Sequence, residues 1–330
     1  MNDIRQHTMG SPDERACNAD HPGGIPDHGW FEVLTRLGRS LARDDVWLRS
    51  AGVAFCLLFA AMPAAAVPVS VFGLLADPQA VHHAVEMLGG LLPDDVSAFL
   101  ADQLHAIGLA SRYQLGAGLG GAVLAALWGA WSGASGLIAA LNTAYREEES
   151  RPFLQRSWHA LLIAAGSGLF MVLTFALVAV LPLALGKLSP DPTWRSIMLL
   201  ARWPALGLMC IVATAMLYRS APCRRAAKWR WVSPGAIAAT VMWLTCSTGF
   251  SFYVAQVPSY NRILGALGIF MLLLTWSYLT AFAILLGAEL NAELERQTTR
   301  DTTRGPARQV GERGAAVADA SVHRVAATAR

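Results

Sequence analysis

Charged side chains are scarce in this sequence. Asp, Glu, Lys and Arg make up 15% of its 330 residues, whereas soluble domains carry about 25%. Hydrophobic residues reach 54%, and the mean hydropathy is +0.40. This balance excludes an ordinary soluble enzyme and favours a protein that crosses a membrane.

Recognisable metal or disulfide motifs are also lacking. The spacing of the five cysteines fits neither a disulfide framework nor a metal site, and three of them lie inside apolar segments. His82, His83 and Glu86 come close together in the chain, but a solvated helix face is the favoured interpretation of this group. We therefore expect no metal and no cofactor.

Apolar residues are gathered into six long runs. A helix that crosses the hydrocarbon core of a bilayer needs about 20 residues, and each run exceeds that length: residues 51–75, 115–141, 158–185, 197–218, 234–254 and 264–290. Their apolar side chains cover every helical face, as in helices surrounded by lipid and protein. The sequence predicts an all-α polytopic membrane protein with six transmembrane helices.

Basic residues are distributed unevenly between the two sides of these spans. Of the 26 Lys and Arg residues, 21 lie in residues 1–49, in the second-to-third and fourth-to-fifth connections, and after the sixth span. Because such residues collect in cytoplasmic loops, both termini are predicted to be cytoplasmic. Basic runs such as Arg224–Arg225 are then explained by topology, and nucleic acid is not an expected partner.

The regions outside the spans divide the chain into three parts. Residues 1–29 are predicted to be a disordered lead, residues 30–296 the membrane domain, and residues 297–330 a mobile cytoplasmic tail. Residues 30–43 form an amphipathic pattern that suits either an interfacial helix on the inner leaflet or a helix packed on the bundle. A second amphipathic helix, near residues 93–107, is expected at the outer surface.

Small residues and prolines mark the first two spans. Gly129 and Gly133 have the spacing that lets two helices approach closely. Pro63 and Pro68 interrupt the hydrogen bonding of the first span and predict a kink or a locally unwound turn. A structural bend is the favoured interpretation, and a substrate path along this helix is the alternative.

Polar residues gather where the second and sixth spans end. The sixth run closes with Glu289, Asn291, Glu293 and Glu295, and the second with Asn142 before "REEESR". Carboxylates at a helix C-terminus oppose its macrodipole, so partners such as Arg146, Arg151 or Arg156 are expected. A structural polar clamp is the favoured interpretation, and a carboxylate that couples protons or substrate is the alternative.

Four stretches together resemble the YihY / virulence factor BrkB family of bacterial inner-membrane proteins, once labelled ribonuclease BN. They are "AGVAFCLLFAAMPA", "LWGAWSGASGLIAALNTAYREEESRPFLQR", "SPGAIAATVMW" and "LGALGIFMLLLTWSYLTAFAILLGAELNAELE". Phe55, Cys56 and Leu264 stand where the family carries tyrosines. The motif positions that the resemblance assigns to an inner-boundary polar cluster are Asn142, Tyr145, Glu148, Arg151, Glu289, Asn291 and Glu293.

The resemblance implies a multi-pass protein of the bacterial inner membrane, with proposed roles in envelope integrity and in transport or lipid export. We therefore expect a transporter or lipid translocator that contacts the bilayer and a lipid or small-molecule substrate. A non-catalytic structural or interaction protein of the envelope is the alternative, and homo-oligomerisation is left open. A ribonuclease is disfavoured because the inner carboxylates have no histidine nearby.

Overall fold

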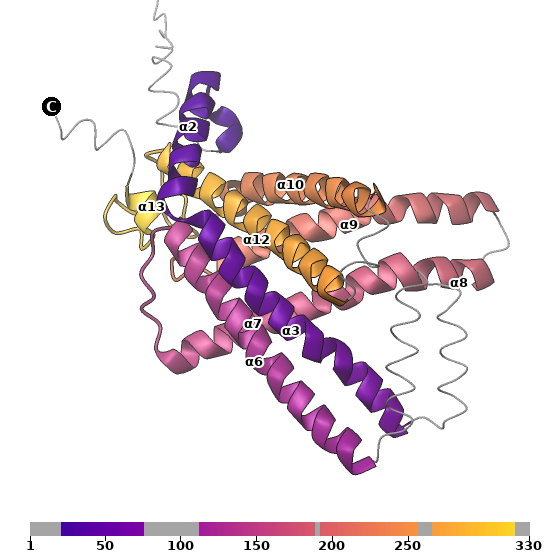
Figure 1. Ribbon diagram of the computed structural model, residues 1–330. Helices are drawn as coiled ribbons and strands as arrows, with labels where there is room; N and C mark the ends of the chain where they lie inside the picture. Colours follow the sequence, from indigo (N-terminus) through magenta and orange to yellow (C-terminus); the bar gives the residue numbers. More distant parts are fainter. Residues whose placement is uncertain (1–20, 76–111, 189–191, 257–265, 321–330) are drawn as a thin grey trace, which may run out of the picture. The chain divides into compact units, whose positions relative to one another are not determined.

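Long helices dominate the structure. The computed structural model describes residues 21–75, 112–188, 192–256 and 266–320 (Figure 1). These residues contain helices and, outside them, an isolated β-bridge between Ala227 and Thr303. The elements are η1 (Pro22–Gly24), α2 (Asp27–Arg43), α3 (Val46–Leu75), α6 (Arg112–Ala144), α7 (Phe153–Phe175), η2 (Ala176–Val180), α8 (Leu181–Leu188), α9 (Pro192–Ser220), α10 (Trp229–Gln256), α12 (Ala266–Arg296) and α13 (Ala316–Asp319).

Six segments of these helices are long and apolar enough to cross a membrane. They are Val46–Ala64, Ala117–Ala144, Phe153–Val178, Thr193–Ser220, Trp229–Val254 and Leu267–Arg296. Each overlaps one predicted span, which confirms the prediction of an all-α polytopic membrane protein. The large apolar side chains of α7 face outward, including Leu162, Leu169 and Phe175, as expected of a helix surface that contacts lipid.

The third span is less regular than predicted. Residues 158–185 were expected to form one helix, but the five residues of η2 adopt π-helical hydrogen bonding between α7 and α8. Pro182 lies in the first turn of α8 and has no N–H to donate to the preceding turn. Since π turns accommodate such irregularities within a helix, the interruption falls immediately before this proline.

The fifth span begins earlier than predicted. The fifth apolar run was predicted to start at residue 234, but α10 starts at Trp229. The Ser233 hydroxyl donates to the Trp229 carbonyl, 2.8 Å away, so Ser233 lies within the first turns. The helix therefore extends into the polar connection that precedes it.

The chain forms two compact units. Unit 1 comprises residues 1–54 and 134–330, and unit 2 comprises residues 55–133. In unit 2, the C-terminal part of α3 packs along α6, where Phe59 and Trp128 meet edge to face with ring centroids 5.5 Å apart. A Cβ atom on Gly129 would lie 2.8 Å from the Ala60 Cα, so this close approach requires glycine.

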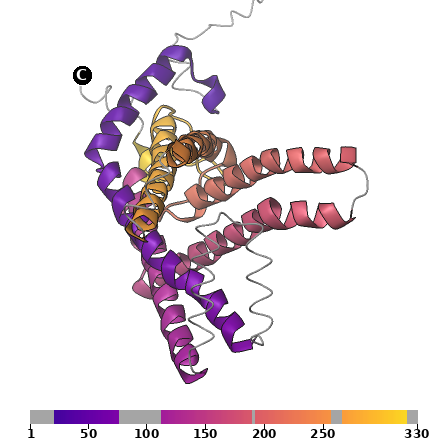
Figure 2. The same cartoon turned by 45° about the vertical axis from the view of Figure 1, so that its right-hand side comes forward.

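In unit 1, α10 packs between α9 and α12, and α2 packs on the last turns of α12 (Figures 1 and 2). The backbones of α10 and α12 touch where Gly235 and Gly287 face each other, with no room for a Cβ atom on either. Val33 and Leu37 of α2 join Leu290 and Leu294 of α12 in a buried apolar cluster. Of the two interpretations of residues 30–43, this arrangement favours the packed helix.

The connections of unit 1 bring several helix ends together. Residues 145–152 join α6 to α7 and residues 221–228 join α9 to α10, so α6 and α9 end where α7 and α10 begin. The last turns of α12 reach the same place, because Asn291 contacts both Tyr145 and Val232. We call this region the polar end of unit 1.

The segment after Arg296, where the sequence predicts a mobile tail, makes many internal contacts as far as residue 320. Thr298 and Thr302 are buried, and the Asp301 carboxylate accepts bonds from the backbone N–H groups of Thr303 and Arg308, each 2.8 Å away. Arg313 donates to the Ala318 carbonyl at 2.7 Å. These bonds fold the segment on itself and against the polar end.

Some predictions fall on residues outside the described ranges. They concern the amphipathic helix near residues 93–107, the group His82, His83 and Glu86, and most of the lead. Pro63 and Pro68 both lie within α3, whose helical hydrogen bonding continues past them to Leu75. The kink of this helix stays a prediction.

Candidate functional site

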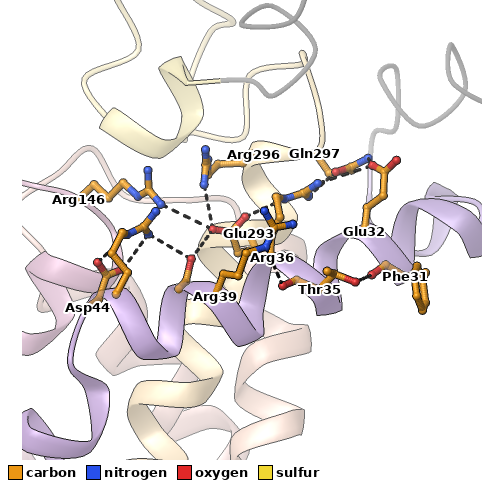
Figure 3. A network of polar contacts seen from close by, with 12 residues as sticks. Phe31, Glu32, Thr35, Arg36, Arg39, Asp44, Arg146, Glu293, Arg296 and Gln297 are labelled. Atoms are coloured by element: carbon orange, nitrogen blue, oxygen red, sulfur yellow. Dashed lines mark hydrogen bonds and ion pairs between the residues drawn. The ribbon is translucent and has the colours of Figure 1, made fainter.

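Glu293 is the centre of a network of ion pairs at the polar end (Figure 3). Its Oε2 atom accepts a hydrogen bond from the Arg36 Nε at 2.9 Å. Its Oε1 atom accepts bonds from the Ser40 hydroxyl and the Arg296 Nη1, both at 2.9 Å, and the Arg146 Nη2 lies 3.8 Å away. The Glu293 side chain is 2% exposed, so this carboxylate is almost fully enclosed by cationic and hydroxyl donors.

Two helices and one helix end supply these groups. Arg36 and Ser40 lie one turn apart on the face of α2 that packs on α12, and Arg296 lies three residues after Glu293 on α12. Arg146 follows α6 with a positive φ of 55°, and the next N–H, of Glu147, bonds to the Asn142 carbonyl at 2.8 Å. This is the αL ending of a helix, where glycine is the usual residue.

Glu289 lies one turn before Glu293 on α12, but its surroundings differ. The residue is 1% exposed, and its Oε1 atom is buried without a hydrogen-bond partner among the described residues. The charged groups that act on it are Asp44, Glu293, Arg43 and Arg146. Two cations and two carboxylates therefore surround a carboxylate that is incompletely hydrogen-bonded.

Asn142 and Asn291 connect the helix ends. The Asn142 amide donates to the Glu149 Oε2 at 2.9 Å, and its oxygen accepts from the Cys223 N–H at 2.8 Å. Asn291 accepts from the Gly235 N–H at 2.8 Å and donates to the Val232 carbonyl at 3.1 Å. Each amide thus satisfies backbone or side-chain groups of a neighbouring connection or helix.

Arg224 and Glu295 form a second, fully buried ion pair. Two parallel bonds of 2.9 and 2.8 Å join the guanidinium to the carboxylate, and the side chains are 1% and 0% exposed. The guanidinium also lies 4.1 Å from the ring centroid of Tyr145, which is fully buried. Burial lowers the pKa of Arg224, but the charge and hydrogen bonds of Glu295 outweigh this effect and raise it.

The structure separates the three consecutive glutamates that follow α6. Glu148, the residue singled out from the sequence, is exposed. Glu149 binds the Arg151 Nε at 2.7 Å, and Glu147 accepts the Ala316 N–H at 2.7 Å. Arg151 also donates to the Ala221 carbonyl at 2.9 Å, so it belongs with Glu149 and not with Glu293.

The pKa values of these two neighbours shift in opposite directions. Burial raises the pKa of Glu147 above its ordinary value. Burial has the same effect on Glu149, but the hydrogen bonds from Arg151 and Asn142 outweigh it and lower the pKa of that carboxyl.

Of the predicted site residues, the structure brings Asn142, Tyr145, Asn291 and Glu293 into the connected polar end. Glu289 lies one turn from Glu293 on α12, and Arg151 binds Glu149, which the Asn142 amide also contacts. Glu148 is exposed, and its membership of the polar cluster stays a prediction. Gly129 and Gly133 lie elsewhere, in unit 2, where Gly133 faces Cys56 of α3 at an ordinary contact distance. Pro63 and Pro68 also belong to unit 2.

Sequence reasoning missed Arg36, Ser40, Arg224 and the Tyr218 hydroxyl, which donates to the Ile284 carbonyl at 2.6 Å. Arg36 was placed on the polar face of an amphipathic helix, whose partner lies 257 residues away. The signal that could have found the contact is Ser40, a small polar residue on that face one turn from Arg36. Within the described ranges, no three His, Cys, Asp or Glu side chains are grouped to hold a metal ion.

These features define a class: a six-span α-helical membrane protein whose helices meet in a buried network of carboxylates, amides and arginines. The sequence profile of the Virulence factor BrkB family matches residues 37–312. The chain belongs to this family, as the resemblance in its motifs predicted.

Individual relatives are known from several bacteria. The chain is 33% identical over 174 residues to YfkH of Bacillus subtilis, a protein named as ribonuclease-like, covering 51% of this chain and 62% of that protein. A UPF0761 membrane protein of Xanthomonas campestris is 31% identical over 45% of the chain and 34% of its own length, and one of Rhodospirillum centenum is 28% identical over 46% and 33%. The matched regions thus span less than two thirds of these relatives. No solved structure matches the chain.

Proposed function

We propose that this protein is a transporter or lipid translocator of the bacterial inner membrane, with cytoplasmic termini, and that it contributes to the integrity of the cell envelope. The observation that supports this proposal is the environment of Glu289. This carboxylate lies inside the last candidate span, is 1% exposed, and has an oxygen without a hydrogen-bond partner in the described part of the chain. Ionisable groups buried in membrane helices are expensive and characteristically mark substrate or proton paths.

Glu289 and Glu293 differ in how completely their carboxylates are hydrogen-bonded. Glu293 is held by Arg36, Ser40 and Arg296, so binding anything else would first break these bonds. Glu289 can take up a proton, or accept a donor from a polar headgroup, without losing a bond at its Oε1 atom. We therefore assign the structural role to Glu293 and the coupling role to Glu289.

The test is lipid translocation in proteoliposomes with fluorescently labelled phospholipid. The wild-type protein is compared with Glu289→Gln, with empty vesicles, and with Glu148→Gln, which removes an exposed carboxylate from the same end. We expect the wild type and Glu148→Gln to move lipid faster than empty vesicles, and Glu289→Gln to fall toward the empty-vesicle rate.

Other outcomes separate the parts of the proposal. Equal rates for the wild type and Glu289→Gln, both above empty vesicles, would keep translocation and reduce Glu289 to a structural residue. No movement above empty vesicles by folded protein would count against lipid export.

A structural or interaction protein of the envelope is the second candidate. The saturated Glu293 network and the folded segment 297–320 favour it, because both fix the polar end in one arrangement. A partner that co-purifies in fixed stoichiometry, together with no transport of lipid or soluble solutes, would support this candidate. Native mass spectrometry of the same preparation would give the oligomeric state.

A further inference from the structure

A cavity of about 420 Å³ opens at the polar end, between the connections that follow α6 and α9 and the segment before α13. Four arginines contribute to its lining, Arg151, Arg219, Arg224 and Arg225, together with His159 and Gly314. The Arg225 N–H donates to the Gly314 carbonyl at 2.8 Å, so the C-terminal segment forms one wall. None of the described residues that line it is a carboxylate.

Two of the four arginines are neutralised from outside the cavity. Arg224 donates two hydrogen bonds to the Glu295 carboxylate, and Arg151 is paired with Glu149. Each of these cations therefore contributes little net charge to the cavity.

The other two arginines have no ion pair among the described residues. Arg219 stacks on Trp229, with its guanidinium carbon 4.7 Å from the ring centroid. Arg225 has an Nη1 atom that is buried without a hydrogen-bond partner. A buried guanidinium nitrogen without an acceptor is unfavourable by itself, and no carboxylate among the described residues pairs with Arg219 or Arg225.

We propose that this cavity binds a phosphate-bearing anion, held by Arg219 and Arg225. The planar guanidinium matches the oxygens of a phosphate group in geometry and charge. The anion balances the positive charge that Arg219 and Arg225 contribute to the lining. This inference concerns binding alone and does not rest on the proposed transport function.

Two sources of phosphate can reach the cavity. Trp229, which stacks on the lining residue Arg219, is 47% exposed, and tryptophan is enriched where membrane helices meet the headgroup layer. A phospholipid headgroup could therefore enter from the leaflet, and free phosphate could enter from the aqueous side.

The experiment uses the full chain in nanodiscs of phosphatidylcholine. Inorganic phosphate is titrated in one arm, monitored by tryptophan fluorescence, and phosphatidic acid replaces part of the lipid in the other, monitored by native mass spectrometry. The variants are Arg225→Gln and Arg219→Gln. The control is Arg230→Gln, which removes an exposed charge from the first turn of α10 outside the lining. Thermal unfolding establishes that each variant is folded.

We expect wild type to bind at least one probe, and each lining variant to bind it about tenfold more weakly, since each loses a charged hydrogen bond. Arg230→Gln should bind like wild type. Binding of phosphatidic acid that phosphate does not displace identifies a lipid headgroup, and binding of phosphate alone identifies a soluble anion. If neither probe binds, or if folded Arg219→Gln and Arg225→Gln bind like wild type, the proposal is wrong.

Discussion

The Glu293 network and the arginine cavity lie at the same end of unit 1 and are built from the same residue type. In the network, Arg36 and Arg296 each donate to one carboxylate, which the chain itself supplies. In the cavity, Arg219 and Arg225 have no carboxylate among the described residues. The difference lies in which molecule provides the anion.

This difference separates structural from binding roles within one polar region. Where the chain supplies both charges, the helices α2 and α12 are fixed to each other, and a ligand would have to compete with an internal partner. Where it supplies only the cations, a ligand completes the arrangement. Exchanging or removing a single charge should therefore turn a structural ion pair into an anion-binding site, or an anion-binding site into a structural ion pair.

The largest effect is expected for Glu295→Gln. It leaves the Arg224 guanidinium, 1% exposed, without its charged partner, and breaking a buried pair in this way costs about 3–5 kcal/mol. The apparent Tm in detergent should fall accordingly. Because Arg224 lines the cavity, added phosphate should raise the Tm of this variant more than that of the wild type.

Glu148→Gln is the matched control for Glu295→Gln, since an exposed side chain away from the network should change stability by less than about 0.5 kcal/mol. An unchanged Tm for Glu295→Gln would mean that the pair with Arg224 does not stabilise the fold.

A smaller loss, about 2 kcal/mol, is expected for Glu293→Gln, because its cations keep partial access to water and can be solvated when the carboxylate is gone. The Arg36, Arg296 and Arg146 side chains are 15%, 18% and 34% exposed. Thermal unfolding measures the change, and phosphate should not restore the lost stability, in contrast to Glu295→Gln. A full rescue by phosphate would show that the two regions do not differ as argued here.

The smallest effect concerns pH and the pair of Glu149 with Arg151. The pKa of Glu149 is lowered in the folded protein, so its contribution is present above the ordinary glutamate pKa and is lost as the pH falls below about 4. The pKa of Glu147 is raised by burial, so its contribution to stability increases as the pH falls. Tm measured against pH should fall less steeply on acidification in Glu149→Gln than in wild type, and more steeply in Glu147→Gln. Parallel curves for all three proteins would contradict this assignment.

The six spans could be predicted from the sequence, because apolar runs of this length have few structural alternatives to a transmembrane helix. The resemblance in its motifs assigned Asn142 and Asn291 to a polar cluster, and both amides bond to groups of neighbouring connections or helices. The choice among the three glutamates could not come from helical spacing, because α6 ends at Ala144 and Arg146 turns the chain with a positive φ. Beyond that turn, Glu147 and Glu149 bind protein groups while Glu148 is exposed.

Local sequence patterns did not predict the long-range contacts or the folding of the C-terminal segment. The contact between Arg36 and Glu293 depends on how α2 lies on α12, which the periodicity of α2 does not specify. Residues 297–320 have the polar composition of a mobile tail. The bonds from Asp301 and Arg313 to backbone groups, which order this segment, depend on individual positions and not on composition.

The contact between Gly235 and Gly287 has a mechanical consequence. With backbone against backbone and the Asn291 oxygen bonded to the Gly235 N–H, α10 and α12 cannot slide along each other without breaking a buried hydrogen bond. The two helices are therefore expected to move together as one rigid body. Any opening of the protein within the membrane would have to occur elsewhere than between α10 and α12, and η2, where the regular α-helical hydrogen bonding is interrupted, is one such place.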